Sequence, residues 1–208
     1  MSAGVDAPQA EAALAPEDSA RADFYALISR LFYAGPDAGL LAAIAGADEM
    51  VAEGENISLA RAWASLMAAA AAMDAAAARE EYDSVFVGTG KAEITLYVTS
   101  YLSESVKENI LVRLRAELAA LGLARQSGVA EYEDHFAGLA EVMRHLIFLA
   151  PDGAVQEQRS FFLRYLAPCY AGVCAALLAT PNTNFYKHVA RFTKAFLDVE
   201  AESLALAQ

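Results

Sequence analysis

The sequence predicts an all-α fold in which about nine helices surround one hydrophobic core. Large apolar residues recur at helical spacing along most of the 208-residue chain. We find neither a sustained alternation with a period of two residues, which marks a half-buried strand, nor an internal repeat. The length is that of one domain, expected over residues 18–208. Residues 1–17 are small, polar and proline-containing, which predicts a flexible N-terminal tail.

Four helices are expected in the first 90 residues. The first starts near Asp18 or Ser19, both good N-caps, and ends at Gly35, since Pro36 suits the first turn of the next helix. The second stops near Gly46. An alanine-rich third helix covers about residues 59–78, and a fourth covers roughly residues 79–87. The apolar stripe of the first helix is Phe24, Leu27, Ile28, Leu31 and Phe32.

Five further helices follow an irregular stretch that contains two glycines. They are expected from Tyr97 or Ser103 to Leu121, over residues 131–150, over 155–166, from Pro168 to Thr180, and from about Pro181 to Ser203. The apolar stripe of the last helix is Phe185, Val189, Phe192, Phe196 and Val199.

The charge balance restricts the class of partner. The chain has 15 basic and 27 acidic residues and a net charge of −12. A nucleic-acid-binding protein needs a basic surface, and an anionic membrane surface would repel this chain. A cationic peptide would instead be attracted.

The location of the protein is predicted from three further features. The first 20 residues contain no lysine or arginine and no run of large apolar residues, so we expect no secretory signal. No segment reaches the ~20 apolar residues of a membrane span. Cys169 and Cys174 lie five residues apart, which turns them away from each other on a helix, so we expect two buried free thiols. These features predict a cytoplasmic protein.

An acidic cluster opens the predicted helix over residues 131–150. Glu131, Asp134 and His135 fall on one side of its first turns, and Gly138 lies on the same side one turn later. Acidic residues favour a helix N-terminus because of the macrodipole, so the cluster can be purely structural. Alternatively, it forms an acidic, histidine-bearing lip beside a groove on the helix surface.

An aromatic cluster flanks the loop that contains Gly88 and Gly90. Its members are Tyr82, Phe86, Tyr97 and Tyr101. Core packing is the usual fate of such residues, and the alternative is a groove wall for an apolar peptide segment. If the aromatic and acidic clusters adjoin, the site would bind a peptide with a basic end and an apolar body.

The sequence does not match the motifs of common enzyme sites. Gly88-Thr-Gly-Lys91 lacks the spacing and the Ser/Thr of a phosphate-binding loop. His135 and His145 lie too far apart along one helix to share a metal, so we predict no catalytic residue, metal or cofactor. One alternative is an all-α metal- or cofactor-binding enzyme that uses Glu131, Asp134 and His135. Another is a scaffold subunit that stays within a complex.

The order of the motifs resembles the TorD/DmsD family of redox-enzyme maturation chaperones, over about residues 20–203. The matching stretches are EYDSVFVGTGK (81–91), LYVTSYL (96–102), EYEDH (131–135), FFLRYLAP (161–168), NFYK (184–187) and FLDVE (196–200). The resemblance implies an all-helical chaperone that binds the twin-arginine signal peptide, or the mature body, of a molybdenum-dependent oxidoreductase. It implies that the apoenzyme is held back from export until its molybdopterin cofactor is inserted. The first two stretches look most like members associated with formate dehydrogenases.

Site residues are carried over from the resemblance by position. The family's Glu-x-x-Asp-His element, implicated in peptide recognition, matches Glu131, Asp134 and His135. Its glycine loop and the following aromatic positions match Gly88, Gly90, Tyr97 and Tyr101. The chain departs from the family's pattern at Thr89, Val98, Tyr132 and Cys169. Family members occur as monomers or helix-swapped homodimers, so either state is expected.

Overall fold

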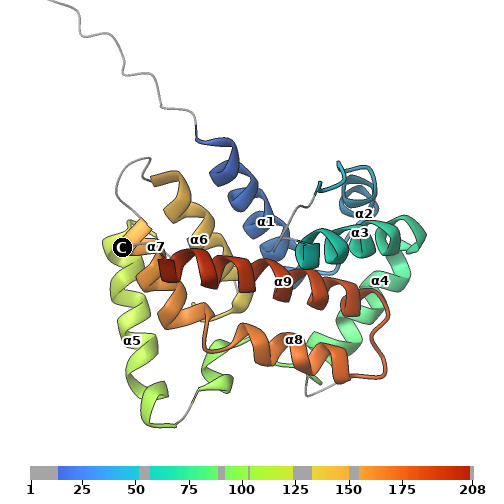
Figure 1. Ribbon diagram of the computed structural model, residues 1–208. Helices are drawn as coiled ribbons and strands as arrows, with labels where there is room; N and C mark the ends of the chain where they lie inside the picture. The colour runs from blue at the N-terminus through green and yellow to red at the C-terminus, as the bar shows by residue number, and fades with distance from the viewer. Residues whose placement is uncertain are drawn as a thin grey trace, which may run out of the picture.

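The computed structural model describes residues 14–51, 57–88, 92–102, 104–123, 133–149 and 155–206. Within these ranges it contains nine α-helices and no strand, which confirms the predicted fold class (Figure 1). The α-helices are α1 (Pro16–Tyr33), α2 (Ala38–Ala45), α3 (Ile57–Ala72), α4 (Ala75–Tyr82), α5 (Glu104–Ala120), α6 (Phe136–Leu149), α7 (Val155–Phe161), α8 (Tyr170–Ala179) and α9 (Phe185–Leu206). Shorter turns extend three of the connections: η2 (Asp83–Val87) and η4 (Phe162–Leu166) are π-helical, and η3 (Val98–Tyr101) is a 3-10 helix.

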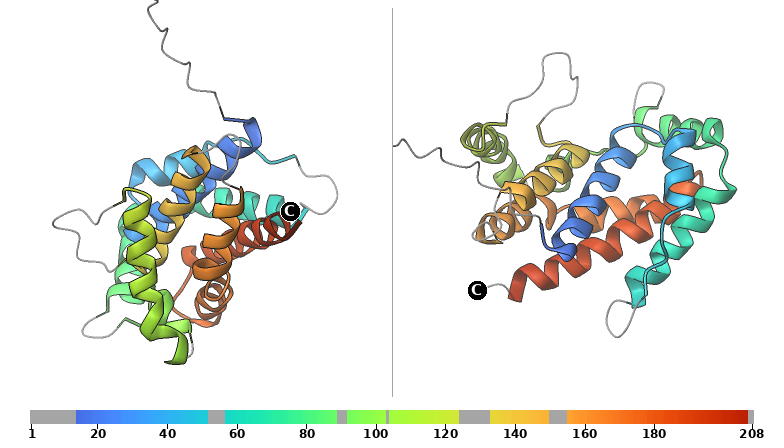
Figure 2. Two further views of the ribbon diagram at one scale, coloured as in Figure 1. Left: turned by 90° about the vertical axis from the view of Figure 1, so that its left-hand side faces the viewer. Right: turned by 90° about the horizontal axis from the view of Figure 1, so that it is seen from above.

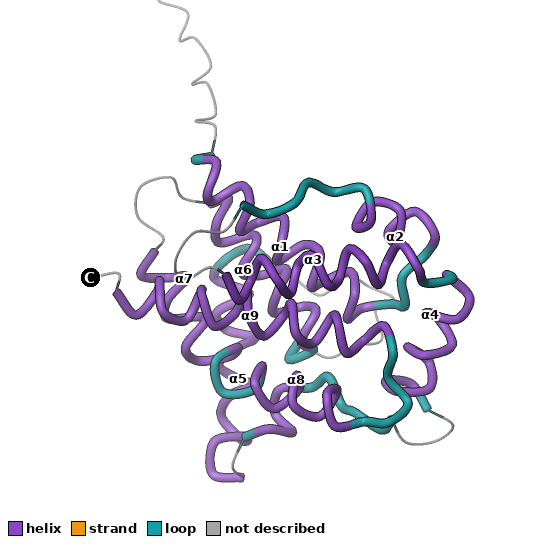
Figure 3. Tube along the Cα trace, turned by 45° about the vertical axis from the view of Figure 1, so that its right-hand side comes forward, coloured by secondary structure: helices purple, strands orange, loops and turns teal. Residues whose placement is uncertain are grey.

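The longest helix, α9, crosses the middle of the molecule. It packs along α3 and α8, and α1 packs along α6 (Figures 1 and 2). Short loops join most of the helices (Figure 3). In the part of the chain that the structure describes, no single helix is long and apolar enough to cross a membrane. The bent pair Val155–Leu166 and Tyr170–Ala179 meets those criteria only when its two parts are taken together.

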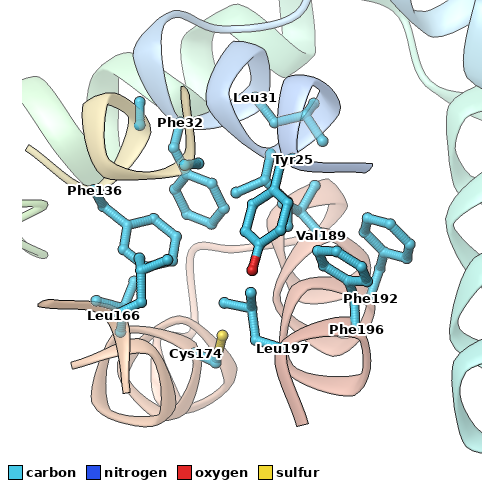
Figure 4. Packing of buried hydrophobic residues seen from close by; sticks show 14 of the residues in the cluster. Tyr25, Leu31, Phe32, Phe136, Leu166, Cys174, Val189, Phe192, Phe196 and Leu197 are labelled. Carbon is cyan, nitrogen blue, oxygen red and sulfur yellow. The ribbon is translucent and has the colours of Figure 1, made fainter. Parts of the chain in front are cut away.

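The core lies between α1, α6, α8 and α9. Figure 4 shows Tyr25 and Phe32 of α1 turned toward Phe136 of α6 and the apolar face of α9. The first four members of the predicted α9 stripe are buried as expected, whereas Val199 is only partly buried. Both cysteines are buried free thiols, as predicted, and burial raises the pKa of Cys174 to about 12.

Several predicted helix boundaries are wrong, including the start of the last helix, which is Phe185 rather than about Pro181, and three of the others have identifiable reasons. The alanine-rich helix expected over residues 59–78 is divided, because the Asp74 carboxylate accepts hydrogen bonds from the Ala76 and Ala77 amides and caps α4. The first helix begins at Pro16, which suits a first helical turn. The helix expected from residue 131 begins at Phe136, because the residues before it pair with a distant segment, as described below.

Glu81 of α4 holds the N-terminal end of α9. Its carboxylate accepts hydrogen bonds from three successive backbone N–H groups, those of Asn184, Phe185 and Tyr186, at 2.8–2.9 Å. The first amides of a helix have no partner within the helix, so a carboxylate from another element can satisfy them and interact favourably with the helix dipole. Glu81 therefore fixes the start of α9 against α4.

Replacing Glu81 with alanine is expected to lower the free energy of unfolding by about 1–3 kcal/mol, because three amides lose a charged acceptor. Chemical denaturation followed by circular dichroism measures this change. Glu80→Ala is the matched control: Glu80 is the exposed neighbouring residue on the same helix, and its loss should change stability by less than about 0.5 kcal/mol. Equal effects of the two substitutions would show that the contact with α9 contributes nothing.

Candidate functional site

The chain between η2 and α5 crosses over the start of α6. We call residues 92–102 of this connection the crossover. Its Val98 amide donates to the Asp134 carbonyl (3.1 Å), and the Phe136 amide donates to the Leu96 carbonyl (2.8 Å). These bonds form a single antiparallel bridge between Tyr97 and His135, whose ring centroids lie 5.5 Å apart. The β-branched cluster of the crossover therefore pairs with the turn that precedes α6.

Asp134 is committed to the crossover. Its carboxylate accepts hydrogen bonds from the Thr99 hydroxyl (2.7 Å) and the Thr99 amide (3.3 Å), and only 3% of the residue is exposed. The expectation that Asp134 lies on the exposed surface of a helix is wrong, because the turn ahead of α6 faces inward against the crossover. The buried carboxylate holds η3 in place.

His135 is also largely buried, with 7% of the residue exposed. Its Nδ1 atom accepts a hydrogen bond from the Ala137 amide (3.3 Å), which requires an unprotonated Nδ1. The imidazole thus contacts the first turn of α6 and the Tyr97 ring. Glu131, the third member of the predicted acidic lip, lies outside the described residues.

The neighbouring Glu133 connects the turn before α6 to α5 through an ion pair with Arg115. Both of its oxygens accept hydrogen bonds from the guanidinium of Arg115, at 3.1 and 3.2 Å. The described acidic residues of the EYEDH motif are therefore engaged in contacts within the protein.

Tyr82 and Phe86 form one aromatic group. The Tyr82 hydroxyl donates to the Tyr33 carbonyl at the end of α1 (2.7 Å), and the Tyr82 ring lies 5.1 Å from the Phe86 ring. Both rings also contact Tyr186 of α9. Tyr82 is buried and Phe86 is half-buried, so Phe86 alone of the pair presents an accessible face.

Tyr97 and Tyr101 form a second group, on the crossover, and both are half-buried. The Tyr101 hydroxyl donates to the Thr95 carbonyl (2.9 Å), and burial raises the pKa of Tyr101 to about 12. The Tyr101 ring lies against Gly172 of α8 so closely that a Cβ at that position would come within 2.8 Å of the ring. Position 172 therefore favours glycine, because even the Cβ of alanine would force the Tyr101 ring to shift.

The two aromatic groups are connected through the core. Phe32 of α1 contacts Phe86 of the first group (centroids 6.0 Å apart) and Phe136, which adjoins His135 (5.1 Å). A second connection is direct, since the Ile94 amide donates to the Val85 carbonyl (3.0 Å). Gly88 has a positive φ of 63°, which favours glycine, where the chain leaves η2. Gly90 lies outside the described residues.

The accessible carboxylates near these aromatic side chains are Asp83 and Glu93, which sequence reasoning missed. Asp83 opens η2, and Glu93 precedes Ile94, whose amide is bonded to η2. Both are exposed, and neither forms an ion pair within the described ranges. π-helical turns such as η2 occur frequently at functional sites. The spacing of apolar residues in the sequence predicts a helix here but does not reveal that its last turn is π-helical.

A separate pocket of about 210 Å³ lies between α5, α6 and α7. Leu121, Leu146 and Phe161 provide apolar walls, and Glu117 and Glu157 lie among its lining residues. Glu117 is paired with Arg113 (3.1 Å) and Arg164 (2.5 Å). Like the groove predicted from the sequence, this pocket has an aromatic side chain beside carboxylates. Its residues, however, are Phe161, Glu117 and Glu157 rather than the predicted ones.

The residues described do not bring three metal-ligating side chains together. Among them, no group of three or more His, Cys, Asp or Glu residues could hold a metal ion. The alternative metal- or cofactor-binding site would use Glu131, Asp134 and His135, and Glu131 lies outside the described residues.

Comparison with models of known protein families identifies the family of this chain. A profile of the family described as nitrate reductase delta subunit matches residues 53–175, more than half of the chain. No curated protein matches the chain significantly. The matched region runs from the segment before α3 into α8 and includes η2, the crossover and the turn before α6.

Proposed function

Because the chain belongs to the nitrate reductase delta subunit family, a family of chaperones for molybdoenzyme maturation, we propose that it holds the catalytic subunit of one such enzyme in its apo form until the cofactor is inserted. The observation that carries this proposal is the family match over residues 53–175. The family acts by binding rather than by catalysis. A cytoplasmic site of action agrees with this role, because the cofactor is inserted before export or assembly.

The segment of the client that we propose as ligand is its twin-arginine signal peptide. Such a peptide has two positive charges followed by an apolar stretch. A chain with a net charge of −12 attracts the charged part over distances of about a Debye length. The apolar part needs exposed apolar or aromatic surface, which the half-buried faces of Phe86, Tyr97 and Tyr101 supply.

The proposed site is the surface of η2 and the crossover. The accessible rings are those of Phe86, Tyr97 and Tyr101, and the accessible carboxylates are Asp83 and Glu93. We assign Tyr82, Asp134 and His135 a supporting role, because their hydrogen bonds position this surface from beneath. Glu131, Gly88 and Gly90 belong to the same proposed site through the family's motifs.

The client that we propose is a formate dehydrogenase. This assignment depends on the glycine-loop and LYVTSYL stretches, which resemble chaperones associated with that enzyme. Purification of the tagged chain from its own cells, followed by mass spectrometry, should recover the catalytic subunit without its cofactor. Recovery of mature, cofactor-loaded enzyme would instead favour a scaffold subunit.

The peptide site can be tested by calorimetric titration with a synthetic peptide that contains two adjacent arginines followed by an apolar stretch. The double variant Asp83→Asn/Glu93→Gln is expected to bind about threefold to tenfold more weakly, since each exposed charge pair contributes about 0.2–1 kcal/mol. The loss should shrink as the salt concentration rises.

Two controls make this experiment decisive. Asp23→Asn/Glu49→Gln changes the net charge equally on α1 and in the α2–α3 connection, and it should bind almost as tightly as the unmodified chain. Glu157→Gln alters the pocket between α5 and α7. A loss of affinity confined to Glu157→Gln would contradict the placement on the crossover. A peptide that fails to bind even the unmodified chain would contradict signal-peptide recognition.

A further inference from the structure

A polar groove lies between α3 and α9, away from the crossover. The two helices pack side by side (Figure 1). Residues of both helices line the groove. The volume of the groove is about 510 Å³, within the range of about 300–1,000 Å³ typical of small-molecule sites. Its polar lining consists of Ser58, Arg61 and Ser65 from α3 and Arg191, Lys194 and Asp198 from α9.

The groove is positive in a protein that is negative overall. It contains Arg61, Arg191 and Lys194 and one carboxylate, Asp198. Lys194 pairs with Asp198 (2.7 Å), which also accepts a hydrogen bond from the Tyr170 hydroxyl (2.9 Å). The two arginines are exposed and make no ion pair within the described ranges. Their charges therefore remain uncompensated in the groove.

Hydroxyl groups complete the set of donors. Ser58 and Ser65 line the groove from α3, and the Ser65 hydroxyl lies 2.8 Å from His188 Nδ1. Burial and the charge of Arg191 lower the pKa of His188, in that order of size. Arg191 and Ser65 both line the groove.

We propose that this groove binds a small phosphate-bearing molecule. Guanidinium groups pair bidentately with phosphate oxygens, and the exposed Ser58 hydroxyl can add a further donor. An acidic protein segment would also meet the cations, but it would bring its own negative charge against a chain of −12. A small anion enters the groove and interacts mainly with the local charges, because more distant charges are screened.

The test uses calorimetric titration of the full chain with inorganic pyrophosphate at low ionic strength. The double variant Arg61→Gln/Arg191→Gln should bind at least about tenfold more weakly than the unmodified chain. Both arginines are exposed, so the variant should fold, and circular dichroism checks this. Each single variant should show part of the loss.

The control Arg30→Gln/Arg144→Gln carries the same change in net charge at positions outside the groove. It should retain pyrophosphate binding, with at most about a twofold change. Equal losses in the two double variants, or no binding by the unmodified chain, would overturn the proposal. Tighter binding of hexaglutamate than of pyrophosphate, lost in the groove variant, would also overturn it and would assign the groove to an acidic peptide.

Discussion

Replacing Phe192 with alanine is expected to lower the free energy of unfolding by about 3–5 kcal/mol. Phe192 is fully buried at the centre of α9, where its ring contacts Phe24 (centroids 5.1 Å apart) and Trp63 (5.3 Å). It therefore connects α9 to both α1 and α3. Alanine would leave a cavity among rings that are held in place by several helices, so little relaxation is expected.

Urea denaturation followed by circular dichroism measures this loss. Phe148→Ala is the matched control, because it removes the same side chain from a position on α6 that is 51% exposed. Its ring contacts the Arg144 guanidinium, so a change of up to about 1 kcal/mol is expected. An unchanged denaturation curve for Phe192→Ala would contradict the position of the core described above.

The apolar stripe that contains Phe192 was predictable because α9 is amphipathic. Its apolar residues follow helical spacing, and exposed charged residues occupy the opposite face. Tyr25 and Glu200 could not be predicted as core residues in the same way. Both are polar, and their burial depends on hydrogen bonds between helices that are distant in the sequence.

The start of α6 shows a second limit of helical spacing. Residues 131–135 have a composition typical of a helix N-terminus, which predicted the helix too early. Asp134 and His135 instead pair with residues of the crossover. The partner of the Asp134 carboxylate, Thr99, lies 35 residues earlier in the chain. No local pattern contains that contact. Substitutions at Asp134 should therefore affect the fold as well as any ligand, contrary to the expectation for a surface residue.

The sequence analysis singled out the segments of the proposed peptide site, but the two exposed carboxylates that we propose there, Asp83 and Glu93, were not among its candidates. The aromatic positions Phe86, Tyr97 and Tyr101 retain accessible faces. Asp83 and Glu93 were not selected because neither lies in the Glu-x-x-Asp-His element that the resemblance associates with peptide recognition. The hydrogen bond from the Ile94 amide to the Val85 carbonyl joins the two segments that carry them, and no local pattern in the sequence contains that contact.

Glu200 is the buried charge whose removal should have the other large effect. Only 2% of Glu200 is exposed, and its carboxylate accepts hydrogen bonds from Arg21 Nε (2.7 Å) and Nη2 (2.9 Å). The Tyr25 hydroxyl donates to the same carboxylate (2.9 Å). Arg21 also donates to the buried Gln158 of α7 (2.9 Å), so the network joins α1, α7 and α9. Burial alone would lower the pKa of Arg21, but its hydrogen bond to Glu200 and the charge of Glu200 raise that pKa above the ordinary value.

Glu200→Ala is expected to lower the free energy of unfolding by about 3–5 kcal/mol, because it leaves Arg21 and Tyr25 without their acceptor in the interior. The side chain of Arg21 is 22% exposed and can reach water, which favours the lower end of this range.

Glu202→Ala removes an equal charge from an exposed position on the same helix and should change stability by less than about 0.5 kcal/mol. The double variant Arg21→Met/Glu200→Leu should recover part of the loss, because it replaces the charged pair by apolar side chains while the Tyr25 hydroxyl still lacks its acceptor. If Glu200→Ala and Glu202→Ala behaved alike in chemical denaturation, the three helices would be held together by apolar packing alone. A full loss in Glu200→Ala together with recovery in the double variant would show that the cost lies in the unpaired buried groups rather than in the missing attraction.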